Sequence, residues 1–249
     1  MCTISWIHDS NGYQLLCNRD EKLTRKSALE PRVAIRNGTR FVAPVDGDFG
    51  GTWIATNEFG VSVCLLNGAN LTGSEIHAPA PRRSRGLLPL DLIPEASVAA
   101  ICDRLRETDL SAFAAFTLAA LEPGHPVAVL EWDGSKKTLH FEKADRFMLT
   151  SSSFDSEEVR RNRQQEYSHV HADEELFAFH RSHGPARSAY STCMHRADAE
   201  TVSFSWIHVS EVVATFYYTP AAPCQQVAGV SKKLLRRPVL STLSSASIQ

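Results

Sequence analysis

Three tight turns near the N-terminus limit the folds that this chain can adopt. Asn11-Gly12 and Asn37-Gly38 each separate two short stretches of strand-forming residues, and a third pair of such stretches flanks Asn57-Glu58-Phe59-Gly60. Asn-Gly tolerates the positive φ angles of the two-residue turns that join antiparallel strands. The first quarter of the chain is therefore predicted to be mostly antiparallel sheet, with strands at residues 3–8, 13–18, 32–36, 40–43, 52–56 and 61–66.

Helical patterns replace the hairpins after residue 83. Apolar residues recur at helical spacing, which predicts helices at 86–93, 96–106 and 110–121. The later part of the chain is predicted to contain a hairpin (127–132 and 138–142), a short strand (146–150), two charged helices (156–167 and 173–180) and two last strands (201–209 and 212–219). Strands at both ends of a helical middle predict a layered α+β fold.

Size and composition fit one globular domain. The chain has 249 residues, of which 43% are hydrophobic and 22% charged, and this is enough to bury one substantial core. No internal repeat or interdomain linker is evident, so residues 1–230 are predicted to form a single domain. Residues 231–249 are basic and then Ser-rich without clear periodicity, and they are predicted to be a loosely held tail.

Charge and hydropathy argue against several classes of partner. The formal net charge is -2 and no block of Lys or Arg interleaves with aromatic residues, so we expect no nucleic-acid partner. The longest apolar stretches fall short of the roughly 20 residues that a membrane span needs. Residues 1–6 lack the basic and apolar regions of a secretory signal, and the six cysteines form no Cys-x-x-Cys pair. A cytoplasmic protein with mostly reduced cysteines is expected.

Familiar metal, nucleotide and serine-hydrolase motifs do not occur in the sequence. The ten histidines offer no His-Glu-x-x-His pattern, and Cys193-Met194-His195 and His169-Val170-His171 lack further ligands at familiar spacing. Structural or surface roles are favoured for these histidines. There is no Gly-x-Ser-x-Gly, no Walker phosphate loop and no Gly-x-Gly-x-x-Gly. No metal site is predicted.

Cys2 has the chemistry of a nucleophile. Methionine aminopeptidases remove an initiator Met that precedes a small residue, and this would leave Cys2 with a free α-amine. An α-amine with a reference pKa of about 8 can accept the thiol proton near neutral pH, so nucleophile and base would belong to one residue. Taken alone, Cys2 is more simply explained as the residue that follows the start codon.

The strand that pairs with the N-terminus supports the catalytic interpretation. The first hairpin brings Asn18-Arg19-Asp20-Glu21 close to the N-terminal amine. Asp20 could bind and orient the ammonium form of the amine, and Asn18 could hydrogen-bond the thiol or a substrate amide. The alternative is that the charged residues form a solvated loop after the strand. With Cys at position two, the functional interpretation is favoured.

Five short motifs occur in an order and spacing typical of one known family. They are Met1-Cys2-Thr3, Asn18-Arg19-Asp20-Glu21, Gly50-Gly51-Thr52-Trp53, Leu66-Asn67 and Ser84-Arg85-Gly86. Together they resemble the NRDE family, which includes the eukaryotic transport and Golgi organisation protein 2. The resemblance implies the N-terminal-nucleophile hydrolase fold, a four-layer αββα sandwich of two stacked antiparallel sheets between helices, similar to choloylglycine hydrolases and penicillin acyltransferases. Eukaryotic members are linked to lipid and haem handling.

The resemblance also implies roles for individual residues. Cys2 matches the hydrolase nucleophile, and Asp20 matches the aspartate that holds the α-amine. Asn67 resembles the asparagine that donates a hydrogen bond to the oxyanion, and a role as a turn residue explains it equally well. The hydrolases place Arg directly before an Asn-x-Asp, whereas here Cys17 holds that place and Arg19 lies inside the triplet.

Four further residues are candidates for substrate binding. A second asparagine of those hydrolases corresponds to residues 150–153, which carry hydroxyl groups here. Ser151 or Ser152 could donate a hydrogen bond to a substrate, but a Ser cluster between a strand and a helix more often caps the helix, so capping is the default. Trp53 is predicted to be core or pocket wall. Arg85 is either a partner for an anionic substrate group or a solvated helix-end residue.

Two functions are compatible with these residues. The first is an amidohydrolase or acyltransferase in which the Cys2 thiolate attacks a non-peptide amide, with no cofactor or metal required. The second keeps the fold but carries haem or an acyl lipid in the same cleft without catalysis, and the departures from the hydrolase pattern favour it somewhat. The expected partners are a small-molecule amide, an acyl lipid or haem, and the sequence leaves a homo-oligomer open.

Overall fold

Two antiparallel sheets form the centre of the protein in the computed structural model, which describes residues 2–68, 83–184 and 186–237. The first sheet has six strands, in the order β10 (Arg146–Ser151), β1 (Cys2–Asp9), β2 (Gly12–Lys22), β11 (Ala199–Val209), β12 (Val213–Thr219) and β13 (Val230–Leu235). The second has seven, in the order β3 (Leu29–Arg36), β4 (Thr39–Val45), β5 (Ile54–Asn57), β6 (Ser62–Asn67), β7 (Phe116–Leu121), β8 (Val127–Trp132) and β9 (Lys137–Glu142).

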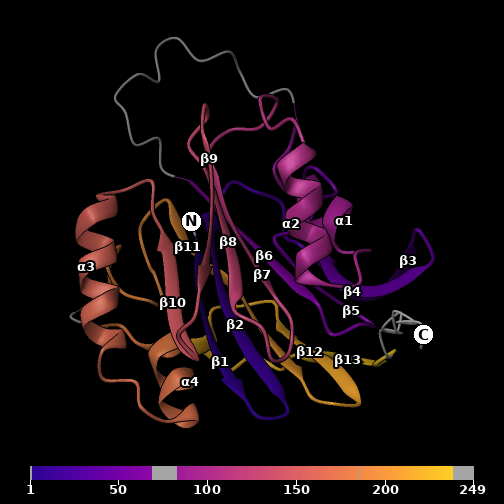
Figure 1. Ribbon diagram of the computed structural model, residues 1–249. Helices are drawn as coiled ribbons and strands as arrows, with labels where there is room; N and C mark the ends of the chain where they lie inside the picture. Colours follow the sequence, from indigo (N-terminus) through magenta and orange to yellow (C-terminus); the bar gives the residue numbers. More distant parts are fainter. Residues whose placement is uncertain (1, 69–82, 185, 238–249) are drawn as a thin grey trace, which may run out of the picture.

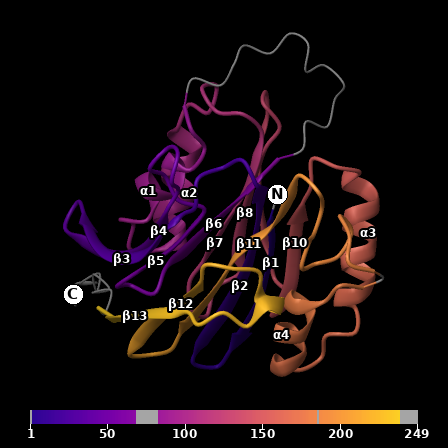
Figure 2. The same ribbon diagram turned by 180° about the vertical axis from the view of Figure 1, so that it is seen from behind.

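Helices cover the outer face of each sheet (Figure 1). One pair, α3 (Ser156–Tyr167) and α4 (Asp173–Arg181), packs on the six-stranded sheet, where Leu176 and Phe179 meet Ile7 and Leu16. The other pair, α1 (Leu87–Leu92) and α2 (Val98–Glu107), packs on the seven-stranded sheet. Figure 2 shows the same four layers from behind. This order confirms the predicted α+β sandwich of two stacked sheets between helical layers.

The first hairpin lies in the interior of its sheet, with both faces covered. Trp6 and Leu15 point into the core between the two sheets, whereas Ile7 and Leu16 point toward the helical layer. Successive side chains of a strand alternate between faces, so these neighbours contribute to two different cores. The hairpin is therefore fixed by packing on both sides, and its N-terminal residue has a defined position.

The prediction of a helix at residues 110–121 is wrong. Residues 110–115 form an irregular turn, and Phe116–Leu121 is strand β7, paired with β6 and β8 in the seven-stranded sheet. Leu118 and Ala120 pack toward α1 and α2, while Ala119 and Leu121 pack between the sheets. Because both faces are buried, the apolar run loses the alternation of a strand and resembles a buried helix in sequence.

The predicted loose tail begins too early. Val230–Leu235 is strand β13, which pairs with β12 at the edge of the six-stranded sheet, and Leu234 is buried there. Lys232 and Lys233 interrupt the apolar pattern because they lie on an edge strand, where charged side chains reach water and discourage pairing with other chains. The rest of the predicted tail from residue 238 lies outside the described residues.

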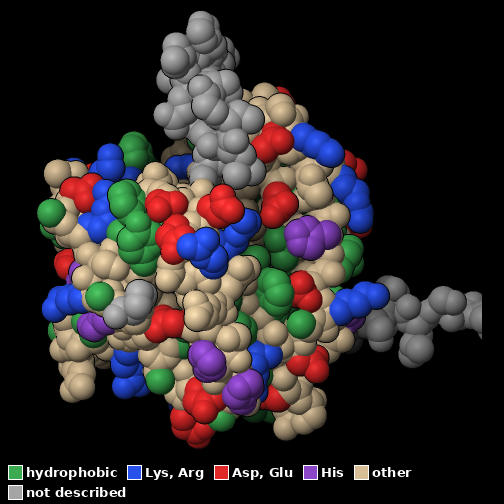
Figure 3. Space-filling model, turned by 90° about the vertical axis from the view of Figure 1, so that its left-hand side faces the viewer, with side chains coloured by type: hydrophobic (Ala, Val, Ile, Leu, Met, Phe, Trp, Pro, Cys, Tyr) green, Lys and Arg blue, Asp and Glu red, His purple; other side chains and the backbone are tan. Residues whose placement is uncertain are grey.

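The outer surface over α3 and α4 is charged and mixed. Figure 3 shows acidic and basic side chains interspersed on this face, without a continuous basic patch. Most residues of α3 are polar, and only Val159 and Arg163 are buried on it. Within the described residues, no helix combines the length and apolar character needed to cross a bilayer.

Candidate active site

Cys2 starts β1 and is held between two neighbouring strands. It lies directly opposite Arg19 of β2 and opposite Ser151 of β10. Side chains that face each other across antiparallel strands lie on the same side of the sheet, so all three belong to the face between the two sheets. Cys2 is 5% exposed, which leaves its thiol almost completely covered by the surrounding residues.

A cavity of about 390 Å³ opens beside Cys2 and brings together most of the predicted site residues. Six of them contribute to its lining, and these are Cys2, Arg19, Asp20, Trp53, Asn67 and Arg85. Asn18, Ser151 and Ser152 do not. The remaining lining includes Glu21, Arg25, Asp46, Phe49 and Arg83. The cavity thus carries four arginines and three acidic residues around one cysteine.

Two glycine motifs meet at the cavity wall. The backbone amide of Thr52 donates a hydrogen bond of 2.8 Å to the carbonyl oxygen of Gly86. A Cβ atom on Gly51 would lie 2.5 Å from the Gly86 carbonyl carbon, closer than real Cβ contacts occur. Glycine is therefore needed at position 51 so that the two backbones can approach. This contact places Arg85 at the cavity beside Trp53, although the two motifs are far apart in sequence.

The thiol of Cys2 belongs to a small cluster of cysteines between the sheets. A hydrogen bond with Cys17 and burial raise the pKa of the Cys2 thiol well above its usual value, and the carboxylate of Asp20 adds to the rise. Cys17 in turn lies 3.9 Å from Cys64, measured between the sulfur atoms. The resting thiol is consequently protonated near neutral pH, and a base must remove its proton before it can attack a carbonyl.

Asp20 lies on the opposite face of β2 from Arg19, toward the helices. Thr201 donates a hydrogen bond of 2.6 Å to Oδ1 of Asp20, and Arg163 approaches Oδ2 at 3.4 Å. The pairing of β2 with β11 shifts register between Thr201 and Ser203, which is next to this contact. A β-bulge of this kind re-aims a side chain, and here it accompanies a fully buried carboxylate one residue from the position that faces Cys2.

Arg163 of α3 is the buried cation that contacts Asp20 between the six-stranded sheet and the helices. Sequence reasoning did not identify this residue. Its side chain is 1% exposed and donates hydrogen bonds to Thr3 and Thr150, in addition to the contact with Asp20. It also bonds the carbonyl oxygen of Tyr190 at 3.3 Å. Burial lowers the pKa of Arg163, while Asp20 raises it. One signal was available, because Val159 lies one helical turn before Arg163 and points to the same buried face.

Asn18 supports the helical layer and does not contact the thiol, which corrects the predicted role. Its side-chain amide donates hydrogen bonds of 2.9 Å to the carbonyl oxygens of His180 and Thr192. Its oxygen accepts a bond of 3.0 Å from Nδ1 of His180. Since that oxygen can only accept, Nδ1 carries the proton, and Nε2 of His180 accepts from Ser5 at 2.7 Å. Both the nitrogen and the oxygen of the Asn18 side-chain amide are therefore hydrogen-bonded on the side of the sheet that faces away from the cavity.

We expect the stability of the protein to fall steeply in acid because of His180. Burial, with a contribution from Arg163, lowers the pKa of His180 from 6.5 to about 3. Between these two values the unfolded chain binds one more proton than the folded chain, so stability is lost as pH falls below 6.5. The contribution is at most about 1.4 kcal/mol per pH unit. Denaturant-induced unfolding at several pH values between 7 and 4 will measure the free energy of unfolding. In His180→Gln this free energy should fall less steeply with decreasing pH. Equal slopes for the two proteins would contradict this assignment.

Arg19 is held by an ion-pair network at the cavity mouth. Its guanidinium bonds Asp46 at 2.7 Å, approaches Glu21 at 3.5 Å and stacks 4.3 Å above the ring of Trp53. Arg25 shares Asp46 at the same distance. Trp53 is 5% exposed, in agreement with the predicted role in the core or the pocket wall. Arg19 thus faces Cys2 across the hairpin while its charge is balanced by acidic neighbours.

Ser151 and Ser152 differ in their surroundings. Ser151 is directly opposite Cys2, and its hydroxyl is buried without a hydrogen-bond partner among the described residues. The hydroxyl of Ser152 accepts a hydrogen bond from the Phe154 amide at 3.0 Å, within the turn before α3. The N-cap of α3 is Asp155, which makes no side-chain cap bond. The default prediction that these serines cap the helix is therefore wrong.

Asn67 and Arg85 both line the cavity. Asn67 ends β6 and is half-buried, with its backbone paired to Phe116. Arg85 precedes α1 and donates a hydrogen bond of 2.7 Å to the carbonyl oxygen of Ala115. Burial lowers the pKa of Arg85. It forms no ion pair with another described residue, although the nearby charge of Glu21 offsets part of the fall in its pKa.

Comparison with known proteins supports the fold and identifies a family match. A family model described as Transport and Golgi organisation 2 matches residues 1–201. No curated protein matches the chain. Among solved structures, the chain is similar to a Caenorhabditis elegans orthologue of N-acylethanolamine-hydrolyzing acid amidase, with a TM-score of 0.60 and 14% identity over 82% of this chain and 92% of that one.

Two bacterial structures are similar as well. A conjugated bile acid hydrolase from Clostridium perfringens has a TM-score of 0.59 and 12% identity over 96% of this chain and 97% of that one. Penicillin V acylase from Agrobacterium tumefaciens has a TM-score of 0.53 and 12% identity over 89% of this chain and 83% of that one. At these identities the likeness shows the fold alone, and it confirms the N-terminal-nucleophile hydrolase fold that the motifs implied.

Proposed function

Since the chain belongs to the Transport and Golgi organisation 2 family, we propose that it hydrolyses or transfers the acyl group of a non-peptide C–N amide, with Cys2 as the nucleophile. The observation that carries this proposal is the position of Cys2, at the start of a buried strand and on the wall of a charged cavity. The similarity of the fold to an amidase, a bile acid hydrolase and a penicillin acylase supports it.

The proposed reaction needs no group beyond the chain and its substrate. After removal of Met1, the α-amine of Cys2 takes the thiol proton, and the sulfur attacks the amide carbonyl carbon. The C–N bond breaks, the departing amine takes the proton, and an acyl thioester remains on Cys2. Water or a second amine then attacks the thioester and restores the thiol. Asp20 keeps the α-amine in place, and the side chain of Asn67 donates to the oxyanion.

Arg85 is proposed to bind a polar or anionic group of the substrate. Its guanidinium is partly buried on the cavity wall, and the cavity holds one more arginine than acidic residues. N-acylethanolamines, penicillin V and conjugated bile acids form the first panel to test, because the similar structures are named for these compounds. Of these, the anionic compounds should depend on Arg85 most strongly.

A carrier of haem or an acyl lipid is the second candidate function. The raised pKa of the Cys2 thiol favours it, because a carrier has no need of a thiolate. The cavity then holds the ligand without any bond being broken, and the same cytoplasmic location and small-molecule partners apply. A homo-oligomer is compatible with either function.

Intact mass and selective labelling test the first candidate. We expect the purified protein to lack Met1 and to take one fast iodoacetamide adduct on Cys2, whose free α-amine can take the thiol proton. The equally buried Cys64 and Cys102 have no such base on the same residue and should react far more slowly. The adduct should disappear in Cys2→Ala. An acyl adduct on Cys2 after incubation with a compound of the panel would establish the intermediate. Retained Met1 with no selective labelling contradicts the catalytic proposal and favours haem or lipid binding.

A further inference from the structure

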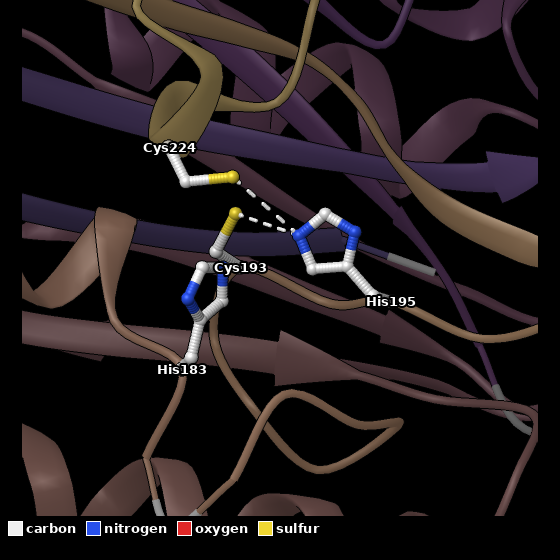
Figure 4. A group of neighbouring side chains, drawn as sticks. All are labelled: His183, Cys193, His195 and Cys224. Atoms are coloured by element: carbon white, nitrogen blue, oxygen red, sulfur yellow. Dashed lines mark hydrogen bonds between the residues drawn. The ribbon is translucent and has the colours of Figure 1, made fainter.

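Four side chains with metal-binding atoms meet behind the candidate active site. They are His183, Cys193, His195 and Cys224, and one ligand atom from each lies within 4.8 Å of those of the others. Figure 4 shows the two sulfur atoms and the two imidazole rings pointing toward one another. His183, Cys193 and His195 lie between α4 and β11, whereas Cys224 belongs to the short helix η1 (Pro223–Gln225). Two separate stretches of chain therefore converge on one point.

Two distances in this cluster match the edges of a tetrahedral site. Nε2 of His195 lies 3.6 Å from the sulfur of Cys193 and 3.5 Å from the sulfur of Cys224. Zinc binds thiolate sulfur at about 2.3 Å and imidazole nitrogen at about 2.0–2.1 Å, so the sulfur-to-nitrogen edge of a tetrahedron around it is about 3.6 Å. One metal ion could therefore bind these three atoms with little movement of the side chains.

Hydrogen bonding alone does not satisfy the groups of the cluster. Nε2 of His195 faces two thiols, and a neutral imidazole nitrogen accepts one hydrogen bond along its single lone pair. Nε2 of His183 is buried and has no hydrogen-bond partner among the described residues. Unsatisfied buried nitrogen is costly in a native protein and calls for a missing partner. A metal ion between the four side chains would satisfy both nitrogens at once.

The surroundings of His195 also suit a metal ligand. Oε2 of Glu200 lies 3.5 Å from Nδ1 of His195, where it can accept a hydrogen bond from a ring that binds metal through Nε2. Arg187 also contacts Nδ1 of His195 at 3.3 Å, and because a guanidinium can only donate, this contact has to give way to the one with Glu200 when Nε2 binds metal. The charge of Arg187 would still offset part of the negative charge of two thiolates. Cys193 is completely buried and the side chain of His195 is 10% exposed, so the site is largely shielded from water.

We propose that His183, Cys193, His195 and Cys224 bind one Zn²⁺ ion in a closed, structural site. Two thiolates and two imidazoles in tetrahedral positions are typical of structural zinc, and a full set of four protein ligands leaves no position for a substrate. Binding converts both thiols to thiolates and releases their protons. The site takes no part in the proposed amide chemistry.

The ion would secure an irregular segment that supports the buried layer beside Cys2. Thr192, next to Cys193, provides a carbonyl oxygen to Asn18, and Tyr190 provides one to Arg163. The backbone amide of Thr201 donates a hydrogen bond of 2.9 Å to the Met194 carbonyl oxygen, and the Met194 amide donates one of 2.9 Å to the Thr201 hydroxyl, which itself donates to Asp20. Because no helix or strand holds the described residues 182–184 and 186–198, the metal would replace the missing backbone ladder.

Metal analysis of the full-length protein tests this site directly. Protein expressed with zinc in the medium and purified without chelator should contain about one zinc per chain. Cys224→Ser should lower the zinc content to less than about a tenth of that value, because loss of one thiolate opens the site. Cys102→Ser is the matched control, since Cys102 is a buried cysteine of α2 far from the cluster in the fold, and it should keep its zinc.

Cobalt substitution supplies a readout that does not depend on folding of the variants. Wild-type protein loaded with Co²⁺ should show the strong visible absorption of tetrahedral cobalt and a sulfur-to-cobalt charge-transfer band, both abolished by excess Zn²⁺. A chelator strong enough to remove the metal should lower the melting temperature. Absence of zinc from the wild type together with absence of the cobalt spectrum overturns the proposal, as does a Cys193–Cys224 disulfide in protein kept under reducing buffer.

Discussion

The variant Cys2→Ala is expected to lose at least about 10⁴-fold of kcat on any amide that the wild type hydrolyses, because no other group can form the acyl thioester. The substitution removes a small, 5% exposed side chain from a rigid strand, so the cavity and its ligand binding should persist. Steady-state kinetics on the best compound of the panel will measure the loss. Comparison with Cys64→Ala, a buried cysteine outside the cavity lining, separates loss of the nucleophile from loss of packing.

A second variant tests the role of the α-amine in the same reaction. A chain with an N-terminal extension that is not removed keeps the Cys2 thiol but converts its amine into an amide, which cannot accept a proton near neutral pH. We expect this chain to be as inactive as Cys2→Ala. Full activity of the extended chain would contradict the N-terminal mechanism, and full activity of Cys2→Ala would exclude Cys2 as the nucleophile.

The layers of the fold were predictable because the local signals agree with the tertiary structure. Asn37-Gly38 forms the turn between β3 and β4, with positive φ angles of 50° and 78° at the two residues. The turn between β1 and β2 is formed by Ser10 and Asn11, because Asp9 pairs with Gly12. The charged helix predicted at 156–167 has the bounds of α3. Such signals depend only on neighbours in sequence, so one chain contains enough information to place them.

The two strands that the sequence failed to predict occur where the position of a strand in its sheet removes the alternation of apolar and polar residues. β7 is covered on both faces, so Phe116–Leu121 carries no polar residue except Thr117 to mark the outer side of a strand. β13 shows the opposite case, because an edge strand tolerates Lys232 and Lys233 and so lacks an apolar pattern. In both places the position of the strand within its sheet decides the sequence pattern, and this position is a tertiary property.

The candidate site was predictable only in part, for a related reason. Cys2, Asp20 and Arg85 could be named because short motifs carry them. The side on which each group points depends on the register of β2 between two strands, and a single residue of difference sends Asn18 to the helices and Arg19 to the cavity. Arg163 and His183 come from segments with no motif, so only the folded structure brings them to their partners.

Among the buried polar residues between the six-stranded sheet and helices α3 and α4, Arg163 should be the one whose substitution lowers the free energy of unfolding most. Arg163→Met keeps the length and apolar stem of the side chain but removes its hydrogen bonds to Thr3, Thr150 and Tyr190 and its charge beside Asp20. Removal of one partner from a buried ion pair costs about 3–5 kcal/mol, because the remaining charge is left uncompensated. Urea denaturation, with Arg160→Met on the exposed face of α3 as control, will measure the difference in unfolding free energy.

A double-mutant cycle with Asp20→Asn distinguishes the ion pair from simple packing. If the cost of Arg163→Met arises from the uncompensated carboxylate, neutralising Asp20 should recover at least about 1 kcal/mol of it, and the two effects will not add. If the effects do add, Arg163 acts through its bonds to Thr3, Thr150 and the 189–190 carbonyls alone. The catalytic activity of Asp20→Asn then tests whether the carboxylate is needed for the reaction. A stable variant without catalysis would show that the carboxylate is needed to orient the α-amine, while Arg163 fixes the carboxylate from behind.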